Sequence, residues 1–162
     1  MHQHTCELAL AGRLLLWSWR HAVRAQRRRE DLPHFVLYTL IQLPKGERVA
    51  AAAETLFAHW AMSARRPLHM SCPDARTLTR DESTFFEALT AAHFDFKDDV
   101  RLLLAELQHG GGLRRTSRAC LELAALLRES DLPLSGRTKA FDFKPRTNPT
   151  KDAGTQSASR RA

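Results

Sequence analysis

The segment that decides the fold class is LALAGRLLLWSWRHAVRAQR, residues 8–27. Its apolar residues recur with the three-to-four-residue period of an α-helix. They form one stripe, made by Leu8, Ala11, Leu15, Trp19, Ala22 and Val23. Four arginines fall on the opposite side: Arg13, Arg20, Arg24 and Arg27. Because Thr5 is a suitable N-cap, the sequence predicts an amphipathic helix that starts after Thr5 and ends near Arg27, with one side in the core.

The rest of the 162-residue chain has the same helical bias. Leucine and alanine dominate, whereas valine occurs four times and isoleucine once, at Ile41. Leucine and alanine favour helices, and β-branched residues favour strands. Hydrophobic residues make up 43% of the chain, which is enough for one core. We therefore predict an all-α fold, a compact bundle of about five or six short helices with a disordered basic C-terminal tail.

Five further helices are predicted from apolar spacing and from start and stop residues. They cover residues 35–43, 47–64, 79–92, 98–109 and 116–128. The strongest start is the TRDE run at 79–82, which has the pattern of a capping box. Segment 35–43 also contains residues that favour a strand, but no second strand-like segment exists to pair with it. The three glycines at 110–112 are interpreted as a flexible break between two helices.

The composition changes at Leu132, where Pro, Ser, Thr, Gly, Lys and Arg replace leucine and alanine. From Pro133 to Ala162 there are seven basic and two acidic residues. Such a segment buries too little apolar surface to offset the entropy of ordering it. We therefore predict a helical domain at 1–131 and a disordered basic tail at 132–162.

The charge and the cysteines restrict the class of protein. The formal net charge is +7, a balance that favours nucleic acid, an anionic membrane surface or an acidic partner. Arginine outnumbers lysine by 20 to 5, so a GC-rich coding sequence explains the same charge. The three cysteines are too few and too widely spaced for a disulfide framework. With no secretory signal and no apolar stretch long enough for a membrane span, we expect a cytoplasmic protein.

One loop pair, His69 and Cys72, has the His-x-x-Cys spacing of metal sites. Imidazole and thiolate suit zinc, but a zinc site needs three or four protein ligands. Further donors would have to come from His59, His93, His2, His4 or Cys6. Cys72-Pro73 also resembles the Cys-Pro element of haem-responsive regulators, which implies a thiolate ligand to haem iron. The alternative is a buried cysteine and a surface histidine in an ordinary loop.

Two groups of arginines form a candidate nucleic-acid interface. They are Arg20, Arg24, Arg27 and Arg28 in the first helix, and Arg114, Arg115 and Arg118 near the start of the last. A guanidinium fork matches a phosphate group. The helices around the glycines at 110–112 have a loose similarity to a helix-turn-helix, which implies a reading helix that begins with the second group. The alternative is a solvated face, partly paired with Glu30 and Asp31.

No motif indicates an enzyme. His109 and the three glycines after it resemble the oxyanion-hole HGGG of lipases and esterases, but the nucleophile elbow of that family is missing. Charge is segregated, with seven acids and two bases in residues 81–106. We therefore expect a small non-enzymatic helical adaptor or regulator that binds a protein partner or itself. Nucleic-acid binding is the first alternative, and metal or haem sensing is the second.

Overall fold

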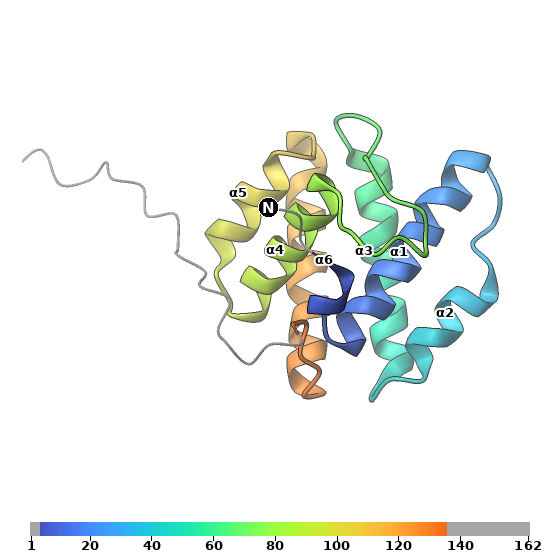
Figure 1. The fold of residues 1–162 in the computed structure, drawn as a ribbon. Helices are drawn as coiled ribbons and strands as arrows, with labels where there is room; N and C mark the ends of the chain where they lie inside the picture. The colour runs from blue at the N-terminus through green and yellow to red at the C-terminus, as the bar shows by residue number, and fades with distance from the viewer. Residues whose placement is uncertain (1–3, 136–162) are drawn as a thin grey trace, which may run out of the picture.

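The computed structural model describes residues 4–135, and within that range it confirms the predicted all-α bundle (Figure 1). The elements in chain order are η1 (Thr5–Glu7), α1 (Leu10–Arg28), α2 (His34–Ile41), α3 (Gly46–Ser63), α4 (Arg80–His93), α5 (Lys97–Ala105) and α6 (Gly110–Glu129). None of these helices combines the length and the hydropathy needed to span a bilayer. The segment 35–43, which also contains residues that favour a strand, forms the short helix α2 as far as Ile41.

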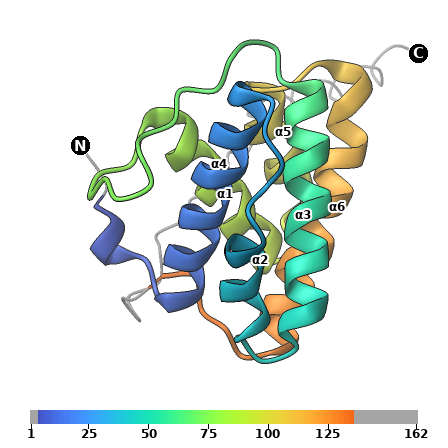
Figure 2. The ribbon, with the colours of Figure 1, turned by 90° about the vertical axis from the view of Figure 1, so that its right-hand side faces the viewer.

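The helices lie in two groups on either side of the long pair α3 and α6. Helices α4 and α5 pack against α6, and α1 and α2 pack against α3 (Figures 1 and 2). Three aromatic rings, from Trp19, Trp60 and Phe85, meet at the centre with centroids 4.2–5.2 Å apart. All three residues are at most 1% exposed. Burying each ring stabilises the fold by about 2 kcal/mol or more, so this cluster joins α1, α3 and α4.

Helix α4 begins where the sequence predicted, at a capping box. The Thr79 side-chain oxygen accepts a hydrogen bond from the Glu82 backbone N–H, at 3.2 Å. The Glu82 carboxylate in return accepts one from the Thr79 backbone N–H, at 2.8 Å. These bonds satisfy two donors that the first turn of a helix leaves without a partner.

Two predicted helix starts are wrong. Residues 5–7 form the separate turn η1, and α1 begins at Leu10. The glycines at 110–112 are not a break, because they form the first turn of α6. A Cβ on Gly112 would lie 1.9 Å from the Cβ of Ser63, so the end of α3 requires a glycine there.

The start of the predicted tail packs on the core. Leu134 is 6% exposed, and its carbonyl accepts a hydrogen bond from the Ala9 N–H at 3.0 Å. A Cβ on Gly12 would lie 2.6 Å from the same carbonyl oxygen, which explains the glycine in α1. Residues 132–135 therefore extend the helical domain. The rest of the predicted tail, 136–162, lies outside the described residues.

Candidate interaction surfaces

Arg20 is not on the surface, contrary to the helical pattern, because only 2% of the residue is exposed. Its Nε and Nη2 donate to the two carboxylate oxygens of Glu82, at 2.7 and 2.9 Å. Its two terminal nitrogens also donate to backbone carbonyls in the 73–77 loop, at 2.8–3.3 Å. The guanidinium is therefore enclosed by protein acceptors, so Arg20 does not belong to a phosphate-binding surface.

Two adjacent carboxylates at the start of α4 hold the long loop that joins α3 to α4. Glu82 accepts from the Ser71 N–H at 3.1 Å, in addition to its bonds with Arg20. Asp81 accepts from the Arg66 guanidinium, with two bonds of 2.7 Å, and from the His69 N–H at 2.7 Å. Burial alone would raise the pKa of Asp81, but the hydrogen bonds from Arg66 and His69 outweigh it and lower that pKa. The two carboxylates thus hold the first part of the loop, residues 66–71, against the start of α4.

His69 and Cys72 lie in this loop with exposed side chains. The backbone of His69 is held in place, since its carbonyl accepts from the Thr79 hydroxyl at 2.6 Å. Within residues 4–135, no three or more His, Cys, Asp or Glu side chains come together in a way that could hold a metal ion. The described residues therefore do not complete a zinc site around this pair. Cys120 is fully buried, and burial raises the pKa of its thiol to about 12.

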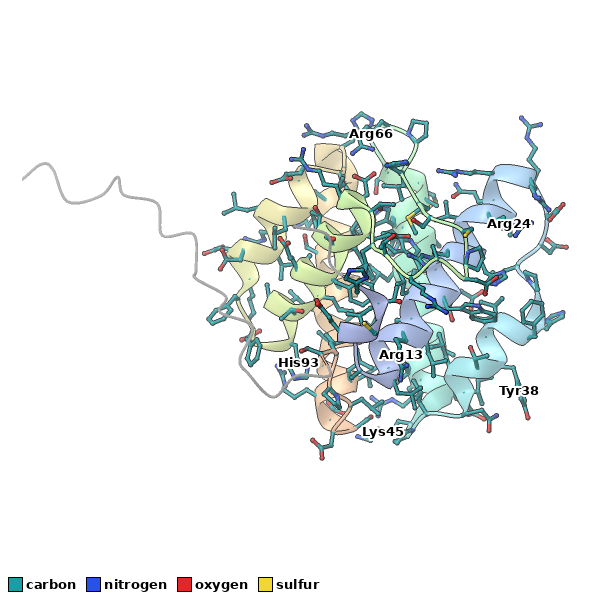
Figure 3. All side chains as sticks on the ribbon, viewed as in Figure 1. Arg13, Arg24, Tyr38, Lys45, Arg66 and His93 are labelled. Atoms are coloured by element: carbon teal, nitrogen blue, oxygen red, sulfur yellow. The ribbon has the colours of Figure 1, made fainter. Side chains whose placement is uncertain are left out.

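Arg24, Arg27 and Arg28, in the last turns of α1, are exposed and lie at one end of the bundle, whereas Arg13 is exposed near the start of the helix. Figure 3 shows Arg24 and Arg66 at the end where α1 and α3 finish and α6 begins. Arg27 donates from Nη2 to the carbonyl of Leu68, just beyond α3. Arg65 donates from Nε to the carbonyl of Gln108, just before α6. These two bonds connect the three helix ends.

Arg65 and Arg66 are site residues that the sequence analysis missed. The two consecutive arginines directly after the predicted helix at 47–64 were the signal in the sequence that could have found them. Arg114, Arg115 and Arg118 are exposed on the first turns of α6, whose N-terminus adjoins the end of α3. The structure therefore places Arg65 and Arg66 at the same end as both predicted arginine groups, with Arg20 excluded.

A second surface is apolar and belongs to α2. Phe35, Tyr38 and Ile41 are 54%, 62% and 40% exposed, and their spacing of three residues puts them on one side of the helix. We call these three residues the α2 surface. Tyr38 points away from the bundle (Figure 3). The helix buries only Val36 and Leu40 on its other side.

A hollow of about 440 Å³ lies beside the α2 surface, and its lining includes Leu10 and Trp17 of α1 and Thr39 of α2. Leu10 is 58% exposed. The Trp17 ring lies 5.8 Å from that of Phe35, measured between centroids, and so connects the hollow to the surface. The apolar walls of this open depression thus come mainly from α1, and α2 contributes Thr39.

A smaller apolar group lies near the turn between α4 and α5. Phe94, Phe96 and Leu102 are each at least 40% exposed, and the Phe94 and Phe96 rings lie 6.3 Å apart. Exposed acids, Asp95 and Asp98, lie in the same stretch. This group lies within the acidic segment 81–106, which holds seven acids and two bases.

Comparison of the chain with protein-family models, with curated proteins and with solved structures gives no significant match in any of the three. The function must therefore be inferred from the surfaces themselves. The α2 surface with its hollow and the arginine-rich end both depart from an ordinary solvated exterior.

Proposed function

We propose that this protein is a non-enzymatic helical adaptor that binds another protein through the α2 surface. The observation that carries the proposal is the exposure of Phe35, Tyr38 and Ile41 together on one side of a short helix. Single exposed apolar residues are common, but a contiguous group marks an interaction site. Aromatic side chains are also enriched among the residues that contribute most to binding energy at protein interfaces.

The hollow beside the α2 surface supports a specific binding mode. A partner helix or extended segment can place one apolar side chain among Leu10, Trp17 and Thr39, while its flanking residues cover Tyr38. Trp17 is half-buried and packs against Phe35, so part of the surface is rigid before the partner arrives. Preorganisation of this kind lowers the entropy cost of association.

The experiment is site-specific photo-cross-linking in cells of origin. A photoreactive amino acid replaces Tyr38, and in a matched control it replaces Glu122, an exposed residue of α6. We expect one discrete adduct from position 38, either with one other protein or with a second copy of this chain, and none from position 122. The double variant Phe35→Ser/Ile41→Ser should lose the adduct while its circular dichroism stays unchanged. No adduct from position 38, or the same adducts from both positions, would refute the proposal.

Nucleic-acid binding is a second candidate function. What supports it is that the exposed arginines in the last turns of α1 and the first turns of α6 flank the end of α3, which hydrogen bonds connect to both helices. Binding through phosphates would weaken steeply with salt, with a logarithmic slope of about −0.7 to −0.9 for each phosphate contacted. Binding of a duplex or a single strand at low salt, measured by fluorescence anisotropy, tests it. An absence of binding at low salt would remove this candidate.

A further inference from the structure

A hollow of about 420 Å³ lies where α1 and α3 end side by side. Its walls come from the last turns of both helices and from the start of the loop after α3. Three arginines contribute to the lining, Arg27, Arg65 and Arg66, and no acidic residue does. The volume falls within the range of pockets that hold small molecules, roughly 300–1,000 Å³.

The three arginines differ in how their charge is balanced. Arg66 forms two hydrogen bonds with the carboxylate of Asp81, so its charge is compensated. Arg27 and Arg65 donate instead to the neutral carbonyls of Leu68 and Gln108. Neither forms an ion pair with a carboxylate among residues 4–135. Two positive charges in the lining of the hollow are therefore uncompensated.

The helix dipole explains only part of this arrangement. Cations near a helix C-terminus stabilise it by roughly 0.3–1 kcal/mol, which accounts for arginines at the end of α1. However, Arg27 reaches across to the loop after α3, and Arg65 reaches across to the residues before α6. Each bond uses one nitrogen of a guanidinium with five N–H donors, so each arginine is held in place with donors left for another acceptor.

We infer that this hollow binds the phosphate group of a small phosphorylated molecule, with Arg27 and Arg65 as its ligands. Planar guanidinium forks match phosphate oxygens in pairs of parallel hydrogen bonds. Val23, Ala61 and Leu68 provide apolar walls for the rest of the molecule. An open hollow of this size with two uncompensated arginines fits a nucleotide-sized ligand better than a long strand, which needs a row of contacts.

The test is calorimetric titration of the full chain with inorganic pyrophosphate and with ATP, in about 150 mM salt so that exposed charges farther than roughly 8 Å are screened. The wild-type chain should bind both. Arg27→Ala/Arg65→Ala should bind at least about tenfold more weakly, because two charge-assisted contacts are lost. Arg48→Ala/Arg101→Ala, which loses the same charge from exposed sites outside the arginine-rich end, should bind like the wild type. Arg65→Lys keeps the charge but not the fork and should bind with intermediate strength, a comparison that holds even where the double variant does not fold.

Failure to bind either compound, or equal weakening in both double variants, overturns the inference. A second arm titrates a single-stranded oligonucleotide. Displacement of the strand by pyrophosphate supports the small phosphate site. A strand that binds and resists pyrophosphate indicates that the phosphates of a nucleic acid are the ligand, and the small-molecule assignment then fails. Tyr38→Ser should leave pyrophosphate binding unchanged, so this result and the adaptor proposal can fail independently.

Discussion

Arg20 and Arg27 lie seven residues apart on α1 and project from nearly the same side of the helix, yet they end in opposite surroundings. Arg20 is 2% exposed and is paired with Glu82 at 2.7 Å. Arg27 is exposed and reaches only a backbone carbonyl. The first turn of α4 supplies a carboxylate beside Arg20, whereas the end of α3 does not supply one beside Arg27. The role of an arginine therefore depends on its acceptor more than on its place in the helical pattern.

The largest expected effect comes from breaking the pair at Arg20. Glu82→Gln preserves the shape of the side chain but leaves a buried guanidinium without its counter-charge. Removing one partner of a buried ion pair destabilises a protein by about 3–5 kcal/mol, and we expect a loss near the lower end of this range because the carbonyls of the 73–77 loop remain. Urea unfolding followed by circular dichroism measures it.

The matched control is Glu129→Gln. Glu129 pairs with Lys45 at 3.2 Å, but both side chains are more than 40% exposed. Exposed pairs contribute about 0–1 kcal/mol, so this variant should unfold almost like the wild type. Equal losses in Glu82→Gln and Glu129→Gln would mean that burial does not distinguish the two pairs.

An intermediate effect is expected at Arg66. Its side chain is 51% exposed, but its partner Asp81 is 2% exposed. Arg66→Ala leaves that carboxylate with the His69 N–H as its remaining hydrogen-bond donor in the loop, and we expect a smaller loss of stability than in Glu82→Gln, because solvent screens the exposed arginine. The same urea titration measures this loss. A loss as large as that of Glu82→Gln would show that the exposed arginine matters as much as the buried one.

The contribution of this pair should also depend on pH. The pKa of Asp81 lies below the ordinary value of 3.8, so acid protonates the unfolded chain first. The stabilisation by Asp81 is therefore present above about pH 4 and is lost as the pH falls through the lower, folded-state pKa. The difference in unfolding free energy between the wild type and Arg66→Ala should shrink as the pH is lowered from 6 toward 2. A difference that stays constant, or that grows in acid, would contradict the assignment.

Local patterns predicted the parts of the fold that depend on local interactions. The capping box at 79–82 begins α4, and the apolar stripe through Leu15 and Trp19 lies in the core. The burial of Arg20 could not be predicted in this way. Its acceptor, Glu82, is 62 residues away in the chain, and a helical pattern shows which side a residue occupies but not what packs against it.

The α2 surface and the start of α6 were missed for related reasons. The segment at 35–43 is mostly apolar, a composition typical of a helix that is buried on all sides. A short helix that is apolar all round buries only the side that meets its neighbours, so Tyr38 stays in water. The glycines at 110–112 looked like a break because their helical role depends on the closeness of Ser63.

The central claim is that Arg20 is structural and Arg27 binds a ligand. One measurement tests it directly, namely urea unfolding of the wild type, Glu82→Gln and Arg27→Ala with and without pyrophosphate. A ligand at a hundredfold excess over its Kd stabilises the native state by about 2.7 kcal/mol. We predict that Glu82→Gln loses basal stability but keeps this ligand-induced gain, and that Arg27→Ala keeps its stability within about 0.5 kcal/mol but loses most of the gain. A full gain in Arg27→Ala, or basal losses of equal size in both variants, would contradict the account.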